Sequence, residues 1–154
     1  MCTPAVHHRL PRAGVDAIEC AETALLTVAM AIHQPLRAET VALLLDHQRR
    51  GIAVAVVSGT HQPDDVLEVL ECFTRSATHG GRLGSIVVAS VRPTDDEHAD
   101  NDSDSDDVIA GADVDRWLEM SDIAEQAGVE LLEWFVIDGD VRCPRDQLGE
   151  PPRW

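Results

Sequence analysis

The pattern of apolar and polar positions predicts three helices and four strands. Apolar residues recur with helical spacing over residues 14–33, 63–75 and 113–127. Nearly continuous apolar runs lie between these segments and indicate strands that are buried on both faces of a sheet. The predicted strands cover residues 39–46, 52–57, 85–90 and 129–137. This order is typical of one α/β domain, in agreement with the length of 154 residues.

The connections between these segments predict which strand is central. The first two strands are joined by a short polar turn, residues 47–51, so we expect an antiparallel hairpin. A helix then leads to strand 85–90, which is the arrangement of a crossover that places this strand inside the sheet. In α/β domains, ligands and catalytic groups collect at the C-terminal ends of central strands. Here that end carries Ser90 and Arg92.

Three segments lack periodicity. Residues 1–13 are predicted to be a flexible N-terminal arm, followed by a single domain over residues 14–140. Within that domain, residues 94–110 are predicted to be a disordered acidic loop, because the segment buries too little apolar surface to offset its ordering entropy. Residues 141–154 hold three prolines and are predicted to be a C-terminal tail, whose Trp154 docks either on the domain or on a partner. The carboxylates of the loop are Asp95, Asp96, Glu97, Asp100, Asp102, Asp104, Asp106 and Asp107.

Charge and composition exclude several classes of function. The net charge of −16 argues against nucleic acid and against anionic membrane surfaces, because both need basic patches. The chain has no apolar run of ~18 residues, so no transmembrane helix is predicted. The N-terminus lacks the apolar core of a signal peptide, so we expect a cytoplasmic protein. The four cysteines show no metal-binding spacing and are predicted to be reduced thiols.

Five stretches follow one another along the chain in an order that can be compared with known domains. They are the strand 41–46 that ends in aspartate, Ser58-Gly59-Thr60, the helix start 63–66, the strand 86–89, and the final helix and strand over 113–137. In this order they resemble the JAB/MPN (JAMM) metalloprotease-type domain, and most closely its RadC branch. The resemblance covers about residues 36–140. It implies a three-layer mixed β-sheet flanked by helices, the JAB/MPN (cytidine-deaminase-like) architecture.

The resemblance also implies that a metal site has been lost. The family uses a glutamate as general base, a His-x-His-Pro and a Ser-x-x-Asp; the two histidines and the aspartate hold Zn²⁺ and leave a position for water. By position, Ser90 and Arg92 replace both histidines, whereas Asp113 keeps the aspartate. Glu39 lies about one residue from the expected glutamate. One retained ligand cannot hold zinc, so no metal and no other cofactor is predicted.

Two of these positions have alternative interpretations. Asp113 is either a remnant of the metal site or the N-cap of the helix that is predicted to begin there. Arg92 either binds an anion or pairs with neighbouring acids. The Asp-His of the family's last strand is replaced by Glu133-Trp134.

Three functions remain open at this point. The first is a non-catalytic JAB/MPN-like domain that acts as a scaffold or protein-interaction module, with a protein partner or through self-association. The second is a divergent metal-dependent hydrolase in which Glu39, His98 and Asp113 converge on a metal. The third is a small-molecule or anion sensor in which Ser90 and Arg92 line the vacated pocket together with Ser58, Gly59 and Thr60. Gly59 is expected to adopt a positive φ, and Thr60 to cap the following helix.

Overall fold

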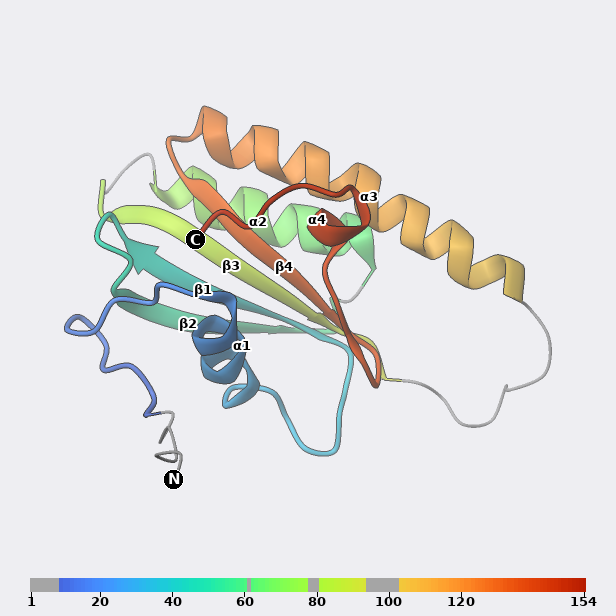
Figure 1. Ribbon diagram of the computed structural model, residues 1–154, viewed down its shortest axis with the longest axis horizontal. Helices are drawn as coiled ribbons and strands as arrows, with labels where there is room; N and C mark the ends of the chain where they lie inside the picture. Colours follow the sequence, from blue (N-terminus) through green and yellow to red (C-terminus); the bar gives the residue numbers. More distant parts are fainter. Residues whose placement is uncertain (1–8, 61, 78–80, 94–102) are drawn as a thin grey trace, which may run out of the picture.

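The chain folds around a five-stranded mixed sheet in the order β2-β1-β3-β4-β5 (Figure 1). The computed structural model describes residues 9–60, 62–77, 81–93 and 103–154, and for residues 103–110 it describes the backbone alone. The strands are β1 (Glu39–Asp46), β2 (Gly51–Ser58), β3 (Leu83–Val91), β4 (Glu130–Ile137) and β5 (Val141–Arg142). The helices are α1 (Ala21–Ala29), α2 (Pro63–Ala77), α3 (Ser103–Gln126) and α4 (Pro144–Gln147).

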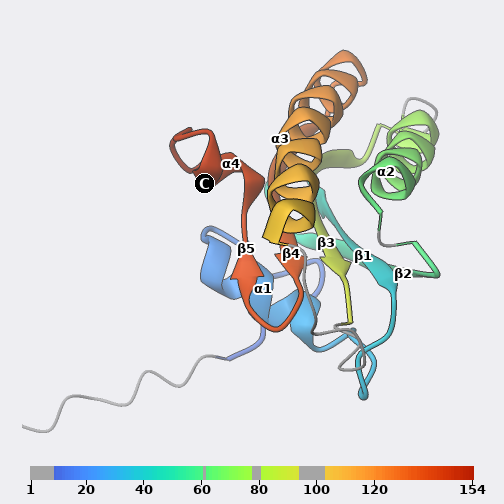
Figure 2. The same cartoon turned by 90° about the vertical axis from the view of Figure 1, so that its right-hand side faces the viewer.

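The strand connections agree with the two predictions made from the loops. β1 and β2 pair antiparallel through the short turn, in which Arg49 adopts a positive φ of 60°. β3 lies at the centre of the sheet, antiparallel to β1 and parallel to β4. β2 and β5 form the two margins of the sheet (Figure 2).

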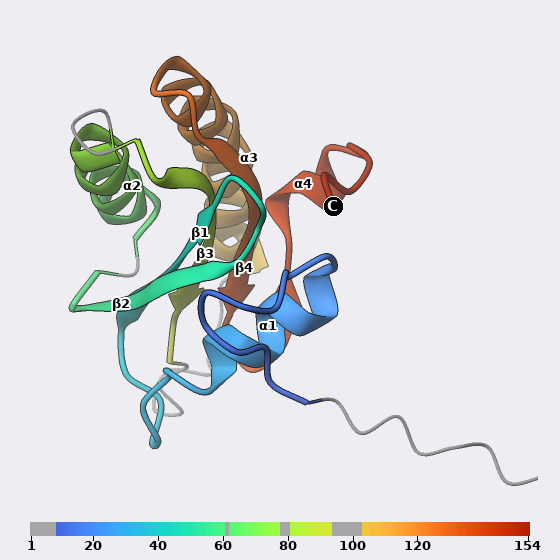
Figure 3. The ribbon, with the colours of Figure 1, turned by 90° about the vertical axis from the view of Figure 1, so that its left-hand side faces the viewer.

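Helices cover both faces of the sheet, which gives three layers (Figure 3). On one face, α2 and α3 enclose a core that includes Leu70, Trp117 and Trp134. On the other face, α1 and the segment before it pack against residues such as Leu43 and Phe135. The predicted α/β class, with a mixed sheet flanked by helices, is therefore confirmed. Both faces are apolar in β1, β3 and β4, as their continuous apolar sequences require.

The first helix is shorter than predicted, because α1 begins only at Ala21. The preceding residues run as an extended segment beside the hairpin turn. Ile18 donates its backbone N–H to the carbonyl of Arg49 (2.8 Å), and Ala17 forms an isolated bridge with Arg50. Ile18 still belongs to the core. Its apolar character therefore indicated burial correctly, whereas its spacing to other apolar residues indicated a helix that is not there.

The second strand is not buried on both faces, contrary to the prediction. β2 lies at the margin of the sheet, and Val54 and Val56 are 42% and 37% exposed. An apolar sequence alone does not distinguish a central strand from an edge strand.

The last helix also differs from the prediction, because α3 begins at Ser103 instead of near Asp113. The second half of the predicted acidic loop is therefore helical, whereas residues 94–102 lie outside the described residues. At the other end, α3 stops at Gln126, and Gly128 adopts a positive φ of 74°, as is common just after a helix.

The C-terminal segment folds back on the domain instead of forming a separate tail. β5 pairs with the end of β4, and α4 follows it. Trp154 packs against the core on the α1 side. Of the two predicted alternatives, docking on the domain or on a partner, the structure shows docking on the domain. Of the predicted N-terminal arm, residues 1–8 lie outside the described residues. Next to them, Arg12 forms an ion pair with Asp16 (3.1 Å).

Within the part of the chain that the structure describes, no helix is both long and apolar enough to cross a membrane.

Candidate functional site

Arg92 and Asp113 form a two-point ion pair at the C-terminal end of β3. The two terminal nitrogens of Arg92 donate to the two carboxylate oxygens of Asp113 at 2.9 and 2.6 Å. The Asp113 side chain is 1% exposed and that of Arg92 13%. Strand β3 positions the arginine, whose backbone N–H donates to the carbonyl of Ile137 (2.8 Å), and α3 positions the aspartate. Parallel N–H···O bonds of this kind are among the strongest polar contacts in proteins.

Asp113 is not a helix cap. It lies in the interior of α3, on the side that faces the sheet, and its carboxylate accepts hydrogen bonds from Arg92. The interpretation of Asp113 as an N-cap is therefore wrong. Arg92 pairs with an acid, but this acid is Asp113, 21 residues along the chain. The acids that directly follow Arg92 in sequence lie outside the described residues.

Ser90 is fully buried on the same face of the sheet. Its hydroxyl oxygen accepts the indole N–H of Trp134 at 2.7 Å, so the two residues bond across the parallel β3–β4 pair. A buried tryptophan N–H needs such an acceptor. Trp134 thus belongs to the core on this face, and Ser90 satisfies its indole N–H.

Glu39 lies on the opposite face of the sheet from these residues. Side chains alternate along a strand, and Glu39 shares its face with Val41, which belongs to the core beside α1. The buried carboxylate of Glu39 accepts the backbone N–H of His33 (2.9 Å) and contacts its Nδ1 (2.7 Å). The structure therefore brings Ser90, Arg92 and Asp113 to one side and separates Glu39 from them. The shift of one residue that the sequence comparison indicated is enough to change the face.

The turn Ser58-Gly59-Thr60 is hydrogen-bonded to the residues around it. Gly59 has the expected positive φ of 77° and donates its N–H to the carbonyl of Ala38 (2.7 Å). The hydroxyl of Thr60 donates backwards to the carbonyl of Val57 (2.6 Å), so it does not cap α2 as expected. The carbonyl of Thr60 accepts the hydroxyl of Thr40.

A second buried ion pair joins β4 to the C-terminal segment, and the sequence analysis missed it. The Nε of Arg145 donates to Glu133 at 2.9 Å, and both side chains are at most 6% exposed. The same guanidinium also contacts Asp146 (2.7 Å) and the carbonyl of Glu150. A buried acidic position in β4 was the available signal, because a carboxylate within an apolar strand requires a basic partner.

Burial governs the titration of the groups around this second pair. Desolvation raises the pKa of Glu133, and the bond from Arg145 opposes that rise only in part. Desolvation also raises the pKa of the neighbouring Cys143 thiol to about 12, with a further contribution from the charge of Glu133. Cys143 is therefore a poor nucleophile at neutral pH.

The structure does not bring Glu39 and Asp113 together. Among the described residues, no group of three or more His, Cys, Asp or Glu side chains is placed to hold a metal ion. Glu39 and Asp113 lie on opposite faces of the sheet, so they do not converge as the hydrolase alternative requires. The third member of that set, His98, lies outside the described residues.

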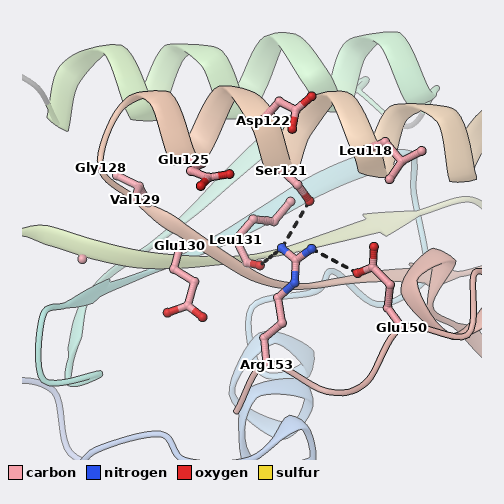
Figure 4. A pocket seen from close by; sticks show the side chains of 11 residues that line it. Leu118, Ser121, Asp122, Glu125, Gly128, Val129, Glu130, Leu131, Glu150 and Arg153 are labelled. Atoms are coloured by element: carbon pink, nitrogen blue, oxygen red, sulfur yellow. Dashed lines mark hydrogen bonds and ion pairs between the residues drawn. The ribbon is translucent and has the colours of Figure 1, made fainter.

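A cavity of about 640 Å³ lies at the other end of β3 and β4, between the C-terminal half of α3 and the final residues of the chain (Figure 4). Arg153 crosses it and donates to Ser121 (3.2 Å), to the carbonyl of Leu131 (2.9 Å) and to Glu150 (3.1 Å). Its guanidinium also lies 4.5 Å from the ring centre of Trp117. Arg153 therefore fastens the chain terminus to α3 and β4 through contacts within the protein. The cavity lining further includes Asp122, Glu125 and Glu130.

Comparisons with known proteins add no further constraint. A scan against protein-family models finds no match for the chain, and a search of the curated proteins finds none either.

Proposed function

We propose that this chain is a non-catalytic JAB/MPN-like domain that acts as a scaffold or protein-interaction module. The resemblance to the RadC branch supplies the expectation of a zinc site at residues 90, 92 and 113. The observation that supports its loss is the ion pair between Arg92 and Asp113. At the position where a divalent cation would sit beside Asp113, the protein supplies a guanidinium of its own.

Electrostatics explain why Arg92 can take the place of a metal ion beside Asp113. A buried carboxylate needs a cation or several donors, because removing it from water costs several kcal/mol. Arg92 meets that need with two hydrogen bonds, so Asp113 has no requirement for a metal. A metal ion would have to displace Arg92 and then tolerate its positive charge close by.

The other predicted ligand position is occupied in a comparable way. Ser90 bonds to Trp134, and the indole ring occupies apolar core space on that face. The side-chain oxygens of both Ser90 and Asp113 thus have hydrogen-bond donors from within the protein. The same contacts weigh against the anion sensor, because Arg92 already binds a carboxylate and Ser90 is fully buried.

Zinc binding tests the proposal directly. We expect the wild-type chain, expressed in zinc-supplemented medium and passed through a desalting column, to contain no stoichiometric zinc by elemental analysis. One zinc ion per wild-type chain would refute the proposal.

The double variant S90H/R92H sharpens the test, because it reinstates both histidines opposite Asp113. We expect this variant to gain zinc affinity by isothermal titration calorimetry, and S90H/R92H/D113A to lose that gain. Circular dichroism checks that the variants fold. If replacing the buried serine prevents folding, the single variant R92H and the wild-type measurement still decide the question.

A further inference from the structure

The outer edge of β2 has no partner strand over most of its length. β2 is the terminal strand of the sheet, and its other side pairs with β1. Only its beginning is covered, because Gly14 donates to the carbonyl of Gly51 (3.0 Å) and Ala17 bridges to Arg50. Among the described residues, no strand pairs with the outer edge from Ala53 to Ser58 (Figures 2 and 3).

This edge lacks the usual protection against strand pairing. Native edge strands carry charges, prolines or bulges that prevent other strands from adding to them. Residues 53–58 read Ala-Val-Ala-Val-Val-Ser, with no charge and no proline. The irregularity in the register lies at the covered beginning of the strand, where Ile52 is skipped between Ala53 and Gly51. The opposite margin differs, because β5 has two residues and continues directly into α4.

We propose that the outer edge of β2 pairs antiparallel with the same edge of a second copy of this chain, in a two-fold symmetric dimer. A two-fold axis brings one patch onto itself, so the strand must be complementary to its own sequence read backwards. The segment from Ala53 to Val57 fulfils this condition when Ala55 lies opposite its symmetry mate. That register also overlaps the whole regular part of the open edge.

The side chains on the α1 side explain what the pairing buries. Val54 and Val56 point to that side and are 42% and 37% exposed in the single chain. In the proposed register, each Val54 lies opposite Val56 of the second copy, which creates a row of four valines across the axis. On the other side only alanines and Val57 meet. Cross-strand pairs of β-branched residues stabilise antiparallel sheets.

Charge favours an uncharged contact and predicts an unusual salt dependence. Each copy carries a net charge of −16, so two copies repel one another at long range. The contacting strands hold no charge, so added salt screens the repulsion without weakening the contact. Association is therefore expected to tighten as salt is raised. A single strand pair covers less than the roughly 800 Å² per partner of standard interfaces, so the dimer is expected to be weak.

The inference supplies a partner for the interaction role proposed above, but it rests on different residues. Stoichiometric zinc in the wild-type chain would refute that role and leave the β2 dimer standing. Conversely, a strictly monomeric chain would refute the dimer and leave the loss of zinc unaffected.

Sedimentation velocity of the full chain over a range of concentrations tests the dimer. We expect a reversible monomer–dimer equilibrium in the wild type that shifts towards dimer at higher salt. The variant V54K should associate at least tenfold more weakly, because it places two lysines against the valine row. V141K is the matched control, since Val141 is a valine of similar exposure (47%) at the opposite margin, and it should behave as the wild type. A wild type that stays monomeric to millimolar concentration, or V54K that dimerises like the wild type, would overturn the proposal.

Disulfide trapping tests the register. In a chain with Cys2, Cys20 and Cys72 replaced by serine, a mixture of V54C and V56C chains should cross-link under mild oxidation, because directly opposed Cβ atoms lie about 4.5–5.5 Å apart. A V141C chain should not cross-link under the same conditions. Absence of the mixed V54C–V56C product, or formation of higher oligomers instead of a discrete dimer, would contradict a closed two-fold pairing.

Discussion

Among the described residues, two arginine–carboxylate pairs have both side chains largely buried, and they differ in how many hydrogen bonds join the two side chains. Arg92 and Asp113 join β3 to α3, and Asp113 directs both carboxylate oxygens at Arg92. Arg145 instead divides its donors among Glu133, Asp146 and a backbone carbonyl. Two charged hydrogen bonds therefore join the side chains of the first pair, whereas one joins Arg145 to Glu133. Loss of the carboxylate should consequently do more harm at the first pair than at the second.

The largest expected effect is that of D113A. The substitution removes both charged hydrogen bonds that Arg92 donates to Asp113 and breaks a buried ion pair, which costs about 3–5 kcal/mol of unfolding free energy. Urea unfolding followed by circular dichroism measures the change. D115A, an exposed aspartate of the same helix, is the control and should lie within about 0.5 kcal/mol of wild type. A loss at Asp113 as small as that at Asp115 would mean that the pair contributes little to stability.

A smaller loss is expected for E133A. Arg145 keeps Asp146 and the carbonyl of Glu150 after the change, so about 2 kcal/mol is expected, the contribution of one charged hydrogen bond. The same urea experiment measures it. If E133A proves as damaging as D113A, the sharing of donors by Arg145 does not protect the second pair.

The second pair should also affect how the unfolding free energy depends on pH. The folded-state pKa of Glu133 is raised by burial, so the native state holds this proton more tightly than the unfolded chain. The stabilising contribution is therefore complete below the ordinary glutamate pKa and is lost as pH rises through the folded-state value. E133Q carries no titrating group at this position. As the pH rises from 4 to 7, the unfolding free energy of E133Q, measured in urea, should therefore increase relative to that of the wild type. A constant difference between the two proteins across that range would show that Glu133 does not titrate with a raised pKa.

The smallest effect is expected when the first pair is replaced as a whole. Exchange of a buried ion pair for apolar residues of similar volume is often close to neutral, because it removes two desolvated charges together. R92L/D113L should therefore be within about 1 kcal/mol of wild type, although D113A alone is strongly destabilising. The unfolding free energies of R92L, D113L and the double variant form the thermodynamic cycle that measures the coupling. Additive losses in the two single variants would exclude a specific pair.

Both pairs lie beyond what local sequence patterns reveal, although one of them was partly anticipated. Arg92 was expected either to bind an anion or to pair with a neighbouring acid, and Asp113 was considered only as a ligand remnant or a cap. The link between them was not foreseen, because it depends on α3 beginning at Ser103 and passing over the end of β3. Arg145 was placed in a tail, so its bond to Glu133 was missed entirely.

The separation of Glu39 from the other site residues illustrates a second limit. A sequence comparison tolerates an offset of one residue, but a strand does not, since neighbouring side chains point to opposite faces. Glu39 consequently meets His33 beside α1 instead of Asp113 beneath α3. The open edge of β2 shows the same limit in another form. Its apolar sequence indicated a strand, but its exposure depends on which strands found a place beside it.

The sequence by itself determined the order of the three longest helices and the four longest strands, the β1–β2 hairpin and the central position of β3. These features follow from the spacing of apolar residues and from short loops, which act over a few residues. Only the tertiary structure decided which charges pair, which face Glu39 occupies and which strand is left at the margin. Ion pairs and sheet edges join or expose residues that are distant along the chain, and their partners are set by packing in three dimensions. For this protein, packing joined Arg92 to Asp113, a pairing that no local pattern in the sequence indicates.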